Sequence, residues 1–172
     1  MRDFDDNEFP LGYLITFRCY GTWLHGDTRG SMDRKHNAYG AAKLAANVHL
    51  ERSDSSQSKH SPIILNAEQR KVVENAVKGV CEHRNFLLRA INVRTNHAHS
   101  VVTALQKPEP ILDAFKSYAT RALRRVGLLS TTIKPWARHG STIYLWKERD
   151  LAKAIEYVLF GQGDELFTLD DD

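Results

Sequence analysis

The amino-acid sequence predicts an α+β protein with a ferredoxin-like antiparallel sheet and helices packed on one face of that sheet. The expected elements follow the order strand, helix, strand, strand, helix, an irregular or strand segment, and helix. The two middle strands, 85–94 and 97–105, are joined by a short connection around Thr95 and Asn96, which makes them antiparallel neighbours. Since the chain of 172 residues has no internal repeat and no visible domain boundary, residues 1–172 are expected to form one domain.

The first expected strand lies within residues 12–23, where the segment GYLITFRCYGTW is rich in β-branched and aromatic side chains. A long polar stretch follows at 25–61, without sustained apolar periodicity apart from a short candidate helix at 41–48. Loops of this length are usually functional or flexible. We interpret the stretch as an insertion or a long, partly ordered loop.

The first helix is expected to begin after Asn66, with Gln69 in the third helical position of a capping box. Its apolar positions recur with helical spacing and should face the core: Val72, Val73, Ala76, Val77, Val80 and Cys81.

Two further helices are expected after the middle strands. One runs over residues 108–126, with prolines in its first turn and a glycine directly after its end. A polar and aromatic segment at 134–146 is expected to hold a short strand or a hairpin. The last helix is expected at 150–160, and the Gly161-Gln162-Gly163 break ends it.

Composition limits the class of protein. The first residues are acidic and include no apolar signal segment, and no apolar run approaches the roughly 18 residues that cross a bilayer. Cys19 and Cys81 lie far apart and are expected to be reduced and buried. These features favour a cytoplasmic protein with no membrane partner.

The middle of the chain is basic although the net charge is only +3. Acidic residues gather at both ends, and the basic residues of the middle are Arg84, Arg89, Arg94, Lys116, Arg121, Arg124, Arg125, Lys134 and Arg138. With Trp136, Tyr144 and Trp146 nearby, such a region suits nucleic acid through phosphate neutralisation and base stacking. The alternative is a solvated basic helix face.

The motif Asn96-His97-Ala98-His99 points to a metal site. Side chains two residues apart on a strand share one face, so His97 and His99 should present two imidazoles side by side, with Ala98 turned into the core. Two neutral imidazoles make half of a divalent-metal site. The alternative is a pair of polar side chains that face solvent.

Helical geometry separates two tyrosines. Tyr118 falls at the edge of an apolar stripe of the second helix and is expected to be a core aromatic. Tyr157 lies roughly 145° from the centre of the face that Leu151, Ile155, Val158 and Leu159 define on the last helix.

A tyrosine directed away from the packed side is available for chemistry, and Lys153 precedes it by one turn, where it could stabilise a phenolate or a phosphate. A phenol beside a metal-bound phosphate suggests in-line attack on a DNA phosphodiester, giving a 5′-phosphotyrosine. The alternative is a tyrosine without a role.

These pieces together resemble a known family. The segment Asn96-His97-Ala98-His99-Ser100-Val101-Val102, a basic amphipathic helix, the segment 140–146 and the helix Ala154-Ile155-Glu156-Tyr157-Val158-Leu159 occur in the order found in single-tyrosine HUH transposases. These include insertion-sequence transposases and REP-associated tyrosine transposases. The resemblance covers most of the chain, from the first strand to Gly163.

The resemblance implies the HUH fold and a site in which His97 and His99 bind Mg²⁺ or Mn²⁺ while Tyr157 is the nucleophile. It also implies a single-stranded or hairpin DNA substrate that is cut and rejoined without external energy. Two features depart from the family. Relatives often carry a polar metal ligand four residues after the tyrosine, where this chain has Gly161, so Gln162 is the candidate third ligand. The 25–61 stretch is longer than compact relatives need.

The sequence therefore favours a metal-dependent DNA strand transferase. The alternatives are a catalytically silent relative that binds structured DNA, and an unrelated ferredoxin-like metal enzyme that acts on small phosphates. A monomer and a homodimer are both compatible with the sequence, and in a homodimer Tyr157 could act on the metal site of either chain. The candidate DNA contacts are Arg94, Lys116, Arg121, Arg124, Arg125, Arg138 and Lys153.

Overall fold

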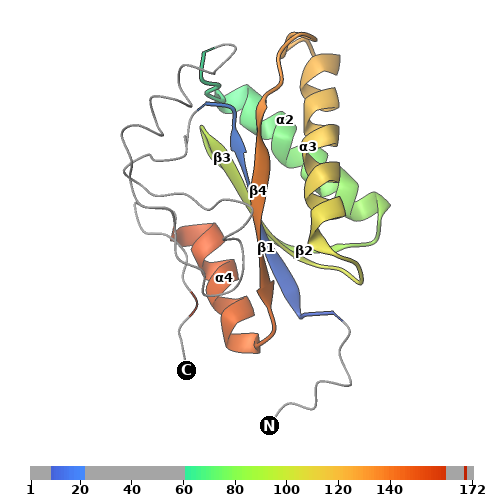
Figure 1. The fold of residues 1–172 in the computed structure, drawn as a ribbon, viewed down its shortest axis with the longest axis vertical. Helices are drawn as coiled ribbons and strands as arrows, with labels where there is room; N and C mark the ends of the chain where they lie inside the picture. Colours follow the sequence, from blue (N-terminus) through green and yellow to red (C-terminus); the bar gives the residue numbers. More distant parts are fainter. Residues whose placement is uncertain (1–8, 22–60, 162–168, 170–172) are drawn as a thin grey trace.

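The computed structural model describes residues 9–21, 61–161 and 169, and Figure 1 shows how their elements are arranged. The elements, in chain order, are β1 (Gly12–Cys19), α2 (Ala67–His83), β2 (Leu87–Val93), β3 (His97–Thr103), α3 (Pro108–Arg125), β4 (Trp136–Leu145) and α4 (Glu148–Phe160). The order of strands and helices is the one that the sequence predicted. The α+β fold class is therefore confirmed.

The four strands form one antiparallel sheet in the order β2-β3-β1-β4. This is the ferredoxin-like order. The strand that carries the two histidines, β3, lies between β2 and β1, as predicted. Its register places His99 opposite Thr16 on β1 and opposite Asn92 on β2.

Helices cover both faces of the sheet, and the prediction that they lie on one face is wrong. The larger core joins α2 and α3 to one face, whereas a second core joins α4 to the other. Figure 1 shows α4 on the opposite side of the strands from α2 and α3. The physical reason lies in β1, where Tyr13 is buried in the larger core and Leu14 in the second. A strand that is apolar on both faces must be covered on both sides.

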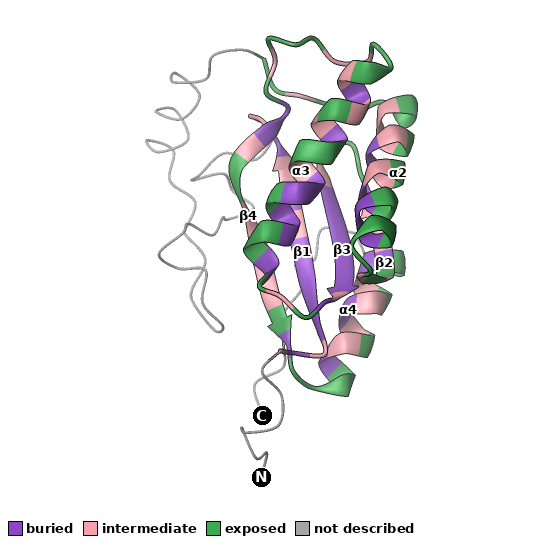
Figure 2. Cartoon of the chain, turned by 90° about the vertical axis from the view of Figure 1, so that its right-hand side faces the viewer, coloured by how far each residue is buried: buried purple, intermediate pink, exposed green. Residues whose placement is uncertain are grey.

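The larger core contains most of the buried apolar side chains, and Figure 2 shows β1 and β3 largely buried beneath α2 and α3. The predicted capping box of α2 is present: the Asn66 side-chain oxygen accepts from the Gln69 amide at 2.8 Å, and Gln69 Oε1 accepts from the Asn66 amide at 2.9 Å. Both cysteines are buried free thiols, as expected.

Several predicted boundaries shift. β1 ends at Cys19 rather than near residue 23, and the segment after α3 forms one ten-residue strand, β4, rather than a short strand or hairpin. Tyr118 is 36% exposed, so its assignment as a core aromatic is wrong. The 25–61 insertion and its candidate helix fall almost entirely outside the described residues. Among the helices that the structure describes, none combines the length and the hydropathy needed to cross a membrane.

Gly140 lies where α3 packs closely on β4, and Gly79 in α2 lies in open space and serves as a control. A Cβ atom on Gly140 would lie 2.5 Å from the Thr16 carbonyl oxygen and 2.9 Å from a Leu112 methyl carbon, whereas a Cβ atom on Gly79 in α2 would meet nothing within 4 Å. We expect Gly140→Ala to lower the free energy of unfolding by about 1–3 kcal/mol, because backbone and core must move apart.

The control, Gly79→Ala, should raise the free energy of unfolding by up to about 1 kcal/mol, because alanine favours a helix over glycine. Urea unfolding of the two variants measures both effects. Equal stabilities would contradict the close approach of α3 and β4.

Candidate functional site

The two histidines lie side by side on the face of the sheet that α4 covers. Their ring centroids are 4.6 Å apart and the rings are inclined by 68°. Ala98, between them, turns to the opposite face and is buried in the larger core. The alternation of strand side chains therefore produces the predicted imidazole pair. The pair does not face open solvent, because α4 lies over this side of the sheet.

His99 is the more enclosed of the two, with 7% of its surface exposed. Its Nδ1 atom lies 2.6 Å from the hydroxyl oxygen of Thr16, its neighbour on β1. Burial is the main cause that lowers the pKa of His99 to about 3, and the nearby His97 and Arg94 contribute to this lowering. The imidazole is therefore neutral at physiological pH, and neutral imidazole is the form that binds metal ions.

A hydrogen bond to its sequence neighbour orients the ring of His97. The Nδ1 atom lies 2.6 Å from the side-chain oxygen of Asn96. Because an amide oxygen only accepts, the ring nitrogen is the donor, and the Nε2 atom then carries the lone pair. Such bonds to the second nitrogen fix the tautomer and direction of metal-binding histidines. Asn96 therefore orients the ring of His97 in addition to its place in the turn between β2 and β3.

Tyr157 lies against the histidine pair. Its ring centroid is 5.4 Å from that of His99, and the two rings meet edge to face at 65°. The predicted direction of Tyr157, away from the packed side of the helix, is wrong: the ring is half-buried and packs on the second core. The buried positions of α4 are Asp150, Ala154 and Val158, whereas Leu159 is 44% exposed.

Asn92 is a site residue that the sequence analysis missed. Its side-chain NH₂ group donates to the Val158 carbonyl oxygen at 3.1 Å. The last carbonyl groups of a helix have no partner within the helix, so this bond caps the end of α4 from the sheet. Asn92 on β2 lies opposite His99 on β3, and Val158 directly follows Tyr157 in α4. This one hydrogen bond therefore links the strand beside His99 to the helix that carries Tyr157. A polar side chain inside an apolar strand was the available signal.

At this site the described part of the chain brings two histidines together. No group of three or more His, Cys, Asp or Glu side chains that could hold a metal occurs within residues 9–21 and 61–161. Gln162, the candidate third ligand, lies outside the described residues. Two imidazoles, each with its Nδ1 atom held by a hydrogen bond, fit a divalent metal whose other ligands are oxygen atoms of water or a bound phosphate.

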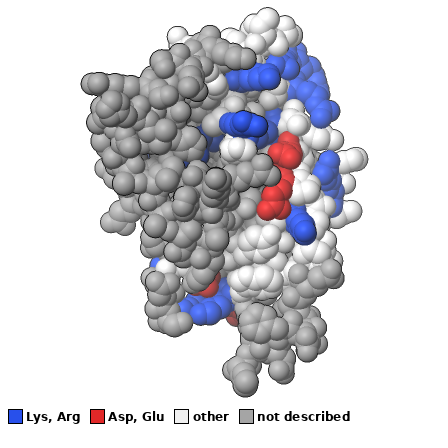
Figure 3. Space-filling model, in the orientation of Figure 1, with Lys and Arg blue, Asp and Glu red and all other residues white. Residues whose placement is uncertain are grey.

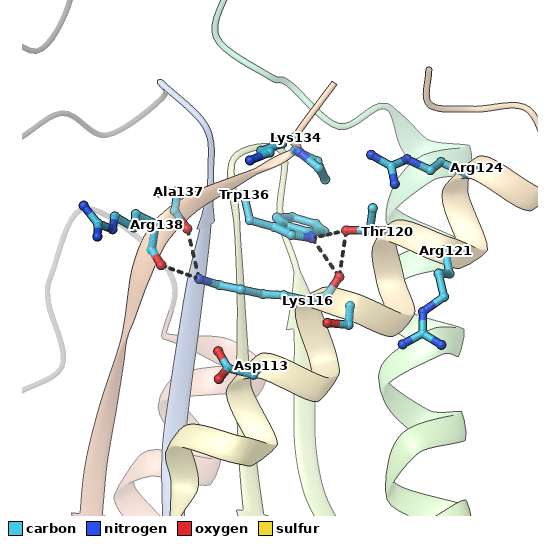
Figure 4. Close-up of a pocket in the computed structure, with 11 residues that line it drawn as sticks. Asp113, Lys116, Thr120, Arg121, Arg124, Lys134, Trp136, Ala137 and Arg138 are labelled. Atoms are coloured by element: carbon cyan, nitrogen blue, oxygen red, sulfur yellow. Dashed lines mark hydrogen bonds between the residues drawn. The ribbon is translucent and has the colours of Figure 1, made fainter. Parts of the chain in front are cut away.

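A second feature is a groove of about 490 Å³ between α3 and the start of β4. Figure 4 shows Arg121 and Arg124 reaching it from α3, with Lys134 and Arg138 on the other side. Figure 3 shows Lys and Arg side chains gathered over this part of the surface, beside a small acidic area. The groove uses the opposite face of the sheet from the histidine pair, because Trp136, which lines it, belongs to the larger core.

Two of the predicted DNA contacts in the groove serve the fold. The Lys116 ammonium donates to the carbonyl oxygens of Ala137 and His139, both at 2.9 Å. Burial lowers the pKa of Lys116 to about 8. Arg124, a candidate DNA contact from the sequence, donates to the Ile133 carbonyl oxygen at 3.0 Å and so helps to hold α3 against the segment before β4.

The other predicted DNA contacts divide between two places. Arg121 and Arg138 are exposed and line the groove, and the guanidinium of Arg121 lies 4.7 Å from the ring centroid of Tyr118. Arg94 is exposed near His99, and Lys153 is half-buried one turn before Tyr157. These two therefore belong with the histidine site. Arg125 is exposed and is not among the groove residues.

Known structures have the same fold. A REP-associated tyrosine transposase bound to a REP hairpin matches with a TM-score of 0.53 and 13% identity, over 94% of this chain and 72% of that one. A proposed transposase from Deinococcus radiodurans R1 matches with a TM-score of 0.50 and 12% identity, over 92% of this chain and 96% of that one. No protein-family model and no curated protein matches.

These likenesses define the fold as that of the HUH transposases, as the sequence resemblance predicted. At 12–13% identity they concern the fold. The chemistry has to be argued from the side chains.

The bond between Asn92 and Val158 can be tested without any activity. We expect Asn92→Asp to loosen α4 selectively, because a donor is replaced by a charged acceptor that faces a carbonyl oxygen. Hydrogen exchange should show faster exchange in the last turns of α4 and unchanged exchange in α2. Arg89→Ala is the control, since it removes an exposed bond on the same strand, to Thr103. Equal effects of the two variants on α4 would contradict this role.

Proposed function

We propose that this chain is a metal-dependent DNA strand transferase of the tyrosine HUH type. The observation that carries the proposal is the contact of Tyr157 with His99, which in turn lies against His97. A phenol beside two metal-type ligands is the set of groups that transfer of a phosphodiester requires.

In the proposed reaction, the Tyr157 oxygen loses its proton to solvent and attacks the phosphorus of a DNA phosphodiester. The bond from phosphorus to the 3′ oxygen breaks, and the departing oxygen takes up a proton to become a 3′ hydroxyl. The 5′ phosphate stays on Tyr157 as a phosphodiester, so a second 3′ hydroxyl can reverse the attack without external energy. Lys153, one turn earlier on α4, is the proposed cation beside this phosphate.

His97 and His99 are the proposed holders of a divalent metal ion, Mg²⁺ or Mn²⁺, with Gln162 as a proposed further ligand. When bound, the metal would polarise the phosphate and stabilise the departing 3′ oxygen. Two imidazoles would leave the other coordination positions to oxygen atoms, the ligands that Mg²⁺ and Mn²⁺ prefer. Thr16 and Asn96 would hold the two rings in place.

The proposed substrate is single-stranded or hairpin DNA. A structural neighbour is bound to a REP hairpin, and this chain carries exposed cations beside its groove. Arg121, Lys134 and Arg138 are the exposed groove cations. We propose that they hold the DNA by its phosphates.

The covalent step is tested by incubating the protein with Mn²⁺ and single-stranded DNA that includes the flanks of its own gene. We expect a protein–DNA adduct on Tyr157, identified by mass spectrometry. Tyr157→Phe should abolish it because the attacking oxygen is gone. Tyr118→Phe is the control and should leave it intact, since that ring lies on α3, across the sheet.

An adduct on another tyrosine would overturn the assignment of the nucleophile. If the wild-type protein binds hairpin DNA and forms no adduct on any DNA tested, the silent DNA-binding relative is the better description.

The groove is tested by the salt dependence of binding. Removing Arg121, Lys134 and Arg138 together should weaken binding to any single-stranded sequence. The slope of log affinity against log salt should fall by about 0.7 for each phosphate that is no longer neutralised, and so by up to about 2. Titrations at several salt concentrations measure this slope, with Lys78→Ala on α2 as a control. An unchanged slope in the triple variant would contradict phosphate binding in the groove.

A further inference from the structure

Two exposed aromatic side chains lie near the end of β4, away from the groove. Tyr144 is 37% exposed and Trp146 is 40% exposed. Their ring centroids are 6.2 Å apart and the rings are only 20° from parallel. The two positions are two residues apart on an extended segment and therefore share a face. Together they form an aromatic platform, which we define as the rings of Tyr144 and Trp146.

A buried tyrosine ring supports the platform. Tyr13, the partner of Tyr144 across β1 and β4, is buried and meets the Tyr144 ring edge to face, with centroids 5.0 Å apart and an angle of 87°. The Tyr13 hydroxyl donates to the Gln106 carbonyl oxygen at 2.9 Å, which fixes this supporting ring. A supported ring loses little side-chain freedom on binding, so it is a preorganised surface for a flat partner.

The platform lies at the end of β4 and the groove at its start, and both are on the face of the sheet that α3 covers. Arg138, which lines the groove, and Tyr144 are six residues apart, which is about 20 Å along a strand. Trp136, the third aromatic residue of this region, does not join the platform. Its ring is buried against Phe17, and its indole N–H donates to Thr120 Oγ1 at 3.0 Å.

An acidic group lies near the platform, since the pKa of Tyr144 is raised by burial and then by the charge of Glu109. A carboxylate near the platform disfavours phosphates there, so close phosphate contacts are expected at the exposed cations of the groove, Arg121, Lys134 and Arg138. The platform then suits the uncharged part of a nucleotide. Only unpaired bases expose the ring faces that stack on aromatic side chains, since bases within a duplex stack on each other.

We propose that the Tyr144–Trp146 platform stacks unpaired bases of the same nucleic-acid strand whose phosphates occupy the groove between α3 and β4. The inference rests on the proposed function to the extent that the ligand is nucleic acid. It assigns to the protein a second contact with that ligand. This contact is made with bases, and it lies on the other face of the sheet from Tyr157. Its sequence preference is weak, because every base has a ring face.

The test compares two ligands of equal length: a single-stranded oligothymidine and a strand of the same phosphates that lacks all bases. With the full chain, Tyr144→Leu and Trp146→Leu should each weaken binding to the base-containing strand by at least about 5-fold. Neither variant should change binding to the strand without bases or the salt dependence, because every cation that binds phosphate is still present. Trp146→Phe should retain most of the affinity.

Phe160→Leu is the matched control, since Phe160 is an exposed aromatic residue on α4. It should bind both strands as the wild type does. If Tyr144→Leu disturbs packing on Tyr13, its urea-unfolding curve will show this, and the more exposed Trp146 then carries the test.

Equal losses on both strands, or no loss on either, would overturn the platform. So would a wild-type protein that binds the two strands equally well. Base-dependent binding that needs Trp146, in a protein that forms no covalent adduct, would support the platform and refute the proposed strand transfer. The two proposals can therefore fail separately.

Discussion

The packing of α4 on the sheet is the interaction on which the rest of the site depends. The face of the sheet that carries the histidines also carries the apolar side chains of Leu14, Val101 and Leu145, so it requires a cover. Ala154 and Val158 of α4 provide this cover. This contact brings Tyr157 to His99 and removes His99 from water. The same burial that stabilises the fold keeps the imidazole neutral, which is the state that can bind a metal.

Structural features that depend on short, regular residue spacing could be predicted from the sequence. The capping box at Asn66 and the alternation through His97 and His99 depend on local geometry alone, and both are present. The direction of Tyr157 depends on the whole of a short helix whose last two turns are apolar almost all round, so the apolar pattern did not locate its buried face. Which face of the sheet a helix covers depends on contacts distant in sequence, such as that of Val158 with Asn92. The structural likeness supports the fold and leaves the metal and the nucleophile to experiment.

The candidate functional groups lie on two different faces of the sheet. The histidine pair and Tyr157 lie on the α4 face, whereas the groove and the aromatic residues at the end of β4 lie on the α3 side. Counting basic residues overstates the number of groove cations that are available to bind phosphate. Lys116 and Arg124 donate to backbone carbonyl oxygens, and they hold α3 against the start of β4 and the segment before it. A basic side chain near a groove can be part of the wall. Here the exposed cations, Arg121, Lys134 and Arg138, are different residues from the structural cations, Lys116 and Arg124.

The contacts of Lys116 also affect the edge of the sheet. β4 is an edge strand, and unpaired carbonyl groups on such a strand can accept hydrogen bonds from another chain. The pairing of β1 with β4 shifts register between Phe17 and Cys19, and Lys116 donates to the carbonyl oxygens of Ala137 and His139 in this irregular stretch. The half-buried ammonium group thus provides hydrogen-bond donors where the regular ladder is interrupted. An irregular edge is a poorer template for another strand, so the start of β4 is expected to resist edge-to-edge association.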